Sequence, residues 1–102
     1  MILVENLVKH LKKNKIDFFT GVPDSILKSF SSHLESYSHK KHVIAANEGS
    51  ATSIGIGHYL STKKVSCVYM QNSGLSNAMN PLISIAGKMV YSIPLFLLIG
   101  WR

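Results

Sequence analysis

Residues 44–59 have the sequence IAANEGSATSIGIGHY, in which a single acid, Glu48, separates an apolar strand from a helix rich in small residues. The strand is predicted over residues 42–46, and Glu48 is the only carboxylate between Glu35 and Arg102. Open α/β sheets bind their ligands at the carboxyl ends of the strands, which is where Glu48 is expected to lie. On position alone, Glu48 is either a charge favoured at the start of a helix or a functional acid.

Strands and helices alternate along the rest of the chain. Apolar runs predict four strands, at residues 17–22, 42–46, 65–71 and 93–99. The last of them is apolar throughout, as in a strand buried on both faces. Helical spacing of apolar residues precedes the first strand, and Asp24 or Ser25 can cap a second helix after it. Two more helices are predicted, one from Glu48 to about Leu60 and one that ends near Lys88. This order indicates an α/β fold, a doubly wound parallel sheet with helices on both faces.

The length and composition of the chain suggest one domain that belongs to a larger protein. The 102 residues are enough for one small domain, and their 16% of charged residues is low for a free-standing one. A covering helix usually follows a strand as hydrophobic as residues 93–99, but here only residues 100–102 remain. We therefore expect residues 1–102 to be an N-terminal domain that is incomplete at its C-terminus.

Several classes of function are disfavoured by the composition. The formal net charge is +6, but the basic residues are lysines with a single arginine, so a solvated basic face is favoured over nucleic-acid binding. No apolar run is long enough for a membrane span, and the N-terminus lacks a signal-peptide pattern. One cysteine, Cys67, is expected to be an inert core thiol, which fits a reduced, cytoplasmic compartment. No set of residues has the spacing of a metal site, and His33, His39 and His42 are assigned to a solvated loop and its border.

The helix after Glu48 carries an unusual stripe of small residues. Gly49, Ser53 and Gly57 follow one another at intervals of four, with Ala51 and Gly55 on a neighbouring line. Each glycine inside a helix costs about 1 kcal/mol relative to alanine. Close approach of another backbone is the usual compensation. Tight packing within the domain and an interface between subunits explain the stripe equally well.

Three of the predicted strands end in short polar segments at one edge of the sheet. These segments are GVPDS at residues 21–25, NEG at residues 47–49 and NSGLSN at residues 72–77. Together they predict a ligand pocket that contains two acids, Asp24 and Glu48, and several small polar groups. Ser73 lacks the flanking glycines of a nucleophile elbow, so a turn that faces a ligand is the better interpretation.

Four motifs in order carry a resemblance to a known family. They are GVPDS at 21–25, AANEG at 45–49, YMQNSGLSN at 69–77 and YSIPLFLLIGWR at 91–102. The chain closely resembles the start of the thiamine-diphosphate-dependent 2-oxo acid decarboxylases, first the phosphonopyruvate decarboxylases and then the alpha chains of sulfopyruvate decarboxylases. The resemblance covers nearly the whole chain except its first dozen residues.

The resemblance implies the pyrimidine-binding domain of that family and a role for each matched residue. Glu48 would contact ring nitrogen N1′ of the aminopyrimidine, where a carboxyl held away from water can share a proton with the ring. Asp24 would face the substrate and help to protonate the reaction intermediate, with Ser25 beside it. The remaining cofactor-binding positions implied in this way are Val22, Pro23, Ser73, Gly74 and Asn77.

The resemblance also implies what this chain lacks. In the family, a second domain holds the diphosphate and Mg²⁺, and its acidic, asparagine-containing motif is missing from this sequence. We therefore expect half of each active site here, no metal ligands in this chain, and no decarboxylation by the fragment alone. The other half would come from another subunit of a homo-oligomer, at least a dimer, or from a separate diphosphate-binding subunit.

The implied activity is conversion of phosphonopyruvate to phosphonoacetaldehyde and CO2, with sulfopyruvate as the alternative substrate. Two interpretations from other classes stay open. One is a non-catalytic module that dimerises through the glycine-rich helix. The other is a flavodoxin-like binder of phosphate ligands, although few glycines follow the first strand to expose backbone N–H groups.

Overall fold

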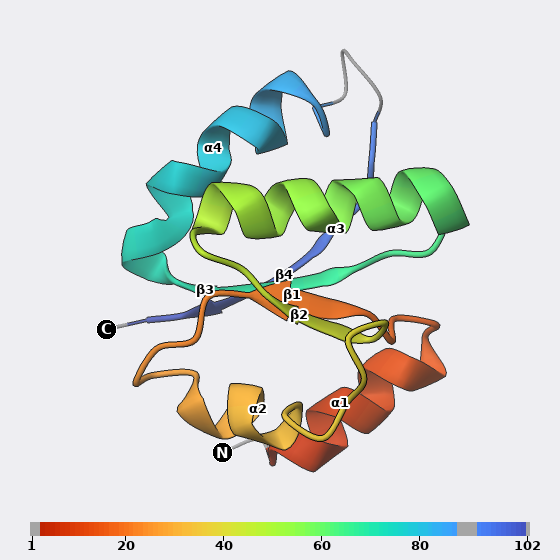
Figure 1. Cartoon of the computed structure of the whole chain (residues 1–102), viewed down its shortest axis with the longest axis vertical. Coiled ribbons are helices and arrows are strands. Elements are labelled where there is room, and N and C mark those ends of the chain that lie inside the picture. The colour runs from red at the N-terminus through yellow and green to blue at the C-terminus, as the bar shows by residue number, and fades with distance from the viewer. Residues whose placement is uncertain (1–2, 88–91, 102) are drawn as a thin grey trace.

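Four parallel strands form the middle layer of the chain, whose residues 3–87 and 92–101 are described by the computed structural model (Figure 1). They are β1 (Phe19–Gly21), β2 (His42–Ile44), β3 (Cys67–Gln71) and β4 (Phe96–Gly100). Their order in the sheet is β2-β1-β3-β4, and each neighbouring pair is parallel.

Helices cover both faces of the sheet. Figure 1 shows α1 (Val4–Lys13) and α2 (Lys28–His33) below it and α3 (Glu48–Thr62) and α4 (Leu75–Ser84) above it. A short 3₁₀ turn, η1 (Asn72–Gly74), joins β3 to α4. No described helix is long and apolar enough to cross a membrane. The predicted doubly wound parallel sheet with helices on both faces is confirmed.

The core is divided by the sheet into two halves. Successive side chains of a strand point to opposite faces. On β3, Cys67 and Tyr69 therefore pack with α1 and α2, whereas Val68 and Met70 pack with α3 and α4. Burial raises the pKa of the Cys67 thiol to about 12, so this cysteine is the inert core group expected from the sequence.

Several predicted boundaries are wrong. The last strand begins at Phe96 and ends at Gly100, and its first four residues are only partly buried. Within the described chain β4 pairs with β3 alone, so it is an edge strand. Both of its faces are nevertheless covered, because Phe96 and Leu98 pack with one half of the core and Leu97 and Ile99 with the other. The fourth helix ends at Ser84, and the predicted end at Lys88 lies outside the described residues.

The stripe of small residues on α3 is explained in part by packing within the domain. A Cβ at Gly55 would lie 2.8 Å from a methyl group of Val68, so α3 rests directly on the sheet at this point. At Gly57, by contrast, a Cβ would meet nothing within 4 Å, and this residue is exposed. Internal packing therefore accounts for Gly55 but leaves the face that carries Gly57 open.

Two histidines are held in sites that disfavour their charged form. His42 Nε2 lies 2.7 Å from the hydroxyl of Tyr69, and the ring of His58 stacks on Phe18 with 4.2 Å between centroids. Burial, in the first place, lowers the pKa of both histidines from the usual 6.5. Neutral imidazole is therefore part of the folded state.

We predict that the domain loses stability on acidification. Because the histidine pKa values are lowered by folding, the unfolded chain binds more protons below about pH 6.5, and stability falls as the pH drops through the folded-state values. The pKa of Asp17 is also lowered, first by its hydrogen bond to Lys41, which extends the loss to lower pH. The urea midpoint should therefore be lower at pH 5 than at pH 7.5. In the His42→Gln variant, the urea midpoint should differ less between pH 5 and pH 7.5. An unchanged difference between the two midpoints would contradict the role of His42.

Candidate functional site

The candidate site lies at the carboxyl edge of the sheet. The chain passes from β1 to β2 on one side and then crosses to β3 on the other side of β1. Ligands of open α/β sheets bind in the crevice outside such a switch point. In Figure 1, α3 and α4 both begin at this edge, on the same side of the molecule as the C-terminal end. The segments that follow β1, β2 and β3 therefore meet here, as the sequence predicts.

Glu48 is held by contacts from two helices. Asn47 caps α3, because its side chain accepts a hydrogen bond of 2.9 Å from the backbone N–H of Ser50. Glu48 follows as the first helical residue and is partly buried. Its Oε1 accepts a hydrogen bond of 3.0 Å from the side-chain amide of Asn77 in the first turns of α4. A carboxyl fixed in this way can accept or share a proton with a ligand placed beside it.

Two glycines make room for this contact. A Cβ at Gly74 would overlap the carboxyl group of Glu48, at 2.5 Å from its Cδ atom. A Cβ at Gly49 would lie 2.9 Å from the backbone oxygen of Asn77. Real Cβ atoms do not approach so closely. At Gly49 the obstacle is backbone, which cannot move without shifting α4, whereas at Gly74 a Cβ would displace the Glu48 carboxyl.

Asp24 lies after β1 and shapes the turn that follows it. Its Oδ1 accepts hydrogen bonds from the backbone N–H groups of Ile26 and Leu27, at 2.7 and 2.8 Å. The helix itself starts only at Lys28, with Leu27 as its cap residue, so the prediction that Asp24 or Ser25 caps it is wrong. The reason is that the residues after Asp24 form a bend first, and the carboxylate is used to fix that bend.

The second carboxylate oxygen of Asp24 is unusual. Oδ2 is buried, and within residues 3–87 and 92–101 it has no hydrogen-bond partner. A buried acceptor without a hydrogen-bond donor lowers the stability of the folded state. Such an atom therefore indicates a partner from outside the described residues, such as a ligand. A ligand that offers a hydrogen-bond donor would satisfy Oδ2.

The other predicted site residues lie at the same edge of the sheet and differ from one another in solvent exposure. Val22 is partly buried, and its N–H donates to the backbone oxygen of Tyr69 at 3.4 Å. Pro23, Ser25 and Ser73 are exposed. The structure thus brings Glu48, Gly74 and Asn77 into direct contact, and places the segment after β1 beside them through the strand order. The roles of all these residues remain predictions.

The site contains no metal cluster of its own. Among the described residues, no group of three or more histidine, cysteine, aspartate or glutamate side chains could hold a metal ion. Two cavities of the chain are lined by other residues, one of them at the opposite edge of the sheet. Sequence reasoning did not identify that cavity. The sequence analysis assigned its lysines to a solvated face. Lys15, Lys41 and Lys64 each come shortly before a predicted strand, and this position was the signal that could have indicated a shared edge.

Comparison with known proteins assigns the family. The model of the family described as "Thiamine pyrophosphate enzyme, N-terminal TPP binding domain" matches residues 1–102. The chain belongs to this family. Thiamine pyrophosphate is the same compound as thiamine diphosphate, so the family expected from the four motifs is confirmed at this level.

Curated relatives are found among decarboxylase subunits. The chain is 32% identical over 98 residues to the sulfopyruvate decarboxylase subunit alpha of Methanococcus maripaludis. The matched segment covers 96% of this chain and 57% of that protein. The chain is 35% identical over 92 residues to the subunit of the same name from Methanocaldococcus jannaschii, covering 90% and 53%. The chain therefore spans about half the length of these relatives.

Solved structures of two decarboxylases share the fold. A benzoylformate decarboxylase from Polynucleobacter necessarius matches with a TM-score of 0.76 and 26% identity over 98% of this chain and 18% of that chain. A thiamine diphosphate-dependent 4-hydroxybenzoylformate decarboxylase from Rhodococcus jostii matches with a TM-score of 0.78 and 27% identity over 95% and 18%. The chain thus matches a small part of each of those chains.

Proposed function

We propose that this domain binds the aminopyrimidine of thiamine diphosphate in a 2-oxo acid decarboxylase whose substrate carries a phosphonate or sulfonate group. The contact of Glu48 with Asn77 and Gly74 carries the proposal, because it fixes one acid at the carboxyl edge of the sheet, in a domain whose family is described as TPP-binding. The four sequence motifs favour phosphonopyruvate, and the names of the two curated relatives favour sulfopyruvate.

The residues present fit the cofactor. Glu48 would hold a proton at ring nitrogen N1′, and the Asn77 amide would keep the carboxyl directed toward the ring. Asp24 would direct its unpartnered Oδ2 to the substrate side, while Oδ1 stays bound to the turn. Val22, Pro23, Ser73 and Gly74 would line the ring. When bound, thiamine diphosphate supplies the carbon nucleophile and the electron sink for loss of CO2.

The remainder of the active site would come from outside this domain. Glu48 is only partly buried here, so a second surface has to exclude water from it. We infer that this surface is a diphosphate-binding domain that also holds Mg²⁺, supplied by another copy of the protein or by a separate subunit. The label "subunit alpha" of the curated relatives supports the second arrangement.

The proposed function is tested by CO2 release from phosphonopyruvate and from sulfopyruvate. The native-length protein is assayed with thiamine diphosphate and Mg²⁺, alone and with its candidate partner subunit, and again with the cofactor withheld. We expect cofactor-dependent release from one of the two acids. Absence of release from both, with every component present, would overturn the proposal.

Asp24→Asn is predicted to lower kcat more than it weakens cofactor binding. Asparagine keeps the Oδ1 acceptor for the N–H groups of Ile26 and Leu27, so the turn stays intact. It cannot donate or accept a proton as a carboxyl does, and general acid–base groups contribute about 10²–10⁴-fold. Steady-state kinetics and a cofactor titration separate the two effects. A collapse of cofactor affinity with kcat unchanged would contradict a substrate-facing Asp24.

A further inference from the structure

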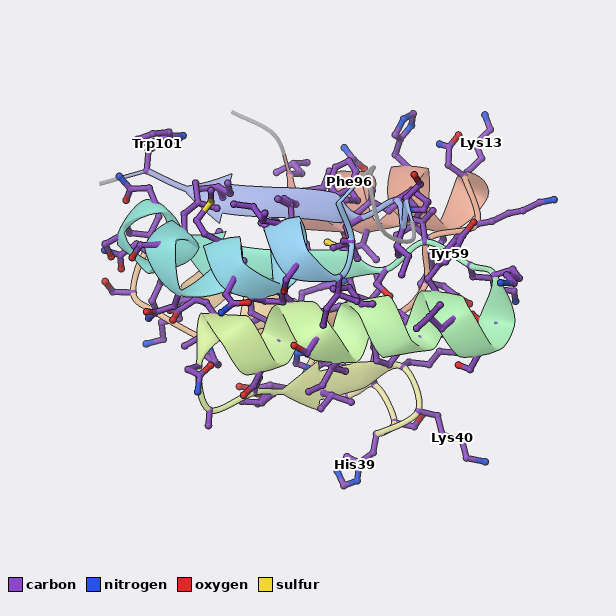
Figure 2. All side chains as sticks on the ribbon, turned by 90° about the horizontal axis from the view of Figure 1, so that it is seen from above. Lys13, His39, Lys40, Tyr59, Phe96 and Trp101 are labelled. Atoms are coloured by element: carbon purple, nitrogen blue, oxygen red, sulfur yellow. The ribbon has the colours of Figure 1, made fainter. Side chains whose placement is uncertain are left out.

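A cavity lies at the amino edge of the sheet, opposite the Glu48 site. It has a volume of about 670 Å³ and is lined by Lys12, Lys15, Asp17, Tyr37, Lys41 and Lys64. Its residues come from the end of α1 and from the segments that lead into β1, β2 and β3. Because all four strands are parallel, their amino ends meet at one edge and their carboxyl ends at the other. Figure 2 shows this separation, with Lys13 and Lys40 at one end of the molecule and Trp101 at the other.

The cavity carries a large local excess of positive charge. One of its four lysines, Lys41, forms an ion pair of 2.7 Å with Asp17, the only acid in the lining. Among the described residues this is the only ion pair made by the four lysines. With four lysines and one acid, the lining has a net formal charge of +3, half of the chain's +6, carried by exposed side chains. Like charges held close together disfavour the folded state unless an anion compensates them.

An aromatic ring lines the same cavity. Tyr37 packs edge to face on Phe19 of β1, with 6.0 Å between centroids, which ties the ring to the core. The ammonium group of Lys12 lies 4.4 Å from the centre of the Tyr37 ring. This contact holds Lys12 at the cavity, so at least one of the cations is positioned before a ligand arrives.

We propose that this cavity binds a small anion with two or more phosphate groups, either an inorganic polyphosphate or the polyphosphate tail of a nucleotide. Lysine ammonium groups bind phosphate as point charges, and the net charge of +3 in the lining matches the charge of a diphosphate or triphosphate. The volume lies within the usual range of small-molecule sites, about 300–1,000 Å³. The site is separate from the proposed cofactor site, because the two lie at opposite edges of the sheet.

The test is a calorimetric titration of the native-length protein with tripolyphosphate and with ATP at about 0.15 M salt, where loose surface attraction is screened. We expect saturable binding with a Kd below about 1 mM. The Lys12→Gln, Lys64→Gln double variant should bind about a hundredfold more weakly, since each lost charge-assisted contact costs about tenfold. The matched control is Lys9→Gln, Lys13→Gln, which removes two exposed lysines of α1 that do not line the cavity. It should change the Kd by less than about threefold.

Each outcome of the titration decides the proposal. Equal affinities for tripolyphosphate and ATP would support a site for the phosphates alone, and tighter binding of ATP would support a nucleotide. Absence of saturable binding of both probes would overturn the proposal. An equal loss in the control variant would also overturn it, because the effect would then be general charge. Tighter binding of a short single-stranded RNA than of either probe would replace it with an extended nucleic-acid surface.

Discussion

Replacing Glu48 by glutamine is expected to slow turnover of the native-length enzyme about a hundredfold or more, the size of a lost acid–base group. Glutamine has nearly the same shape and keeps an Oε1 atom that accepts the 3.0 Å hydrogen bond from Asn77. The variant therefore removes the proton-holding group and leaves the contact between α3 and α4 in place. The measurement is kcat at saturating thiamine diphosphate, with the cofactor affinity determined separately.

Two comparisons make the Glu48→Gln result specific. Glu35→Gln removes an exposed carboxylate from the loop before β2 and should leave kcat unchanged within about twofold. The urea midpoint of Glu48→Gln should match that of the wild type, because the hydrogen bond is kept. A loss of turnover under about threefold would contradict the role of Glu48. It would favour instead a non-catalytic module that dimerises through α3.

The fold was predictable because its signals are local. Apolar runs bounded by polar turns predict strands, helical spacing predicts helices, and their alternation implies parallel pairing. The last strand shows the limit of such signals. An apolar run is the same whether a strand lies inside a sheet or at its edge, and only the sheet order shows that β4 is at the edge. The start of α2 was missed because Asp24 can bond either to a helix start or to a preceding bend.

The candidate site was predictable as a set of strand ends but not as a set of contacts. Parallel strands bring Asp24, Glu48 and Gly74 to one edge in any such fold. That Asn77 donates to Glu48 depends on how α4 leaves η1, and no local pattern encodes this angle. The lysine cavity was missed for the same reason, since its residues are separated in sequence and meet only through the sheet.

Replacing Gly74 by alanine is expected to lower kcat about tenfold or more, through Glu48. Gly74 has φ −85° and ψ −8°, angles that alanine adopts without strain, so the effect is steric and not conformational. The new Cβ would overlap the Glu48 carboxyl and force it away from Asn77. Because the carboxyl is at the end of a partly buried side chain and can move, the urea midpoint should change little. The measurements are kcat and the unfolding midpoint of the same preparation.

Gly57→Ala is the matched control, because a Cβ there meets nothing within 4 Å. It should leave kcat unchanged and stabilise α3 by about 1 kcal/mol, the difference between glycine and alanine in a helix. A loss of activity or assembly in this variant would instead show that a second subunit covers the exposed face of α3.

The double variant Gly74→Ala, Glu48→Gln separates positioning from general damage. Suppose that Gly74→Ala slows turnover only by displacing the Glu48 carboxyl. In a protein that already carries Glu48→Gln, the alanine should then cause little further loss of turnover. The double variant should then be no slower than Glu48→Gln alone, within about threefold. Multiplication of the two single losses would show that Gly74→Ala harms the enzyme by another route, such as direct displacement of the cofactor.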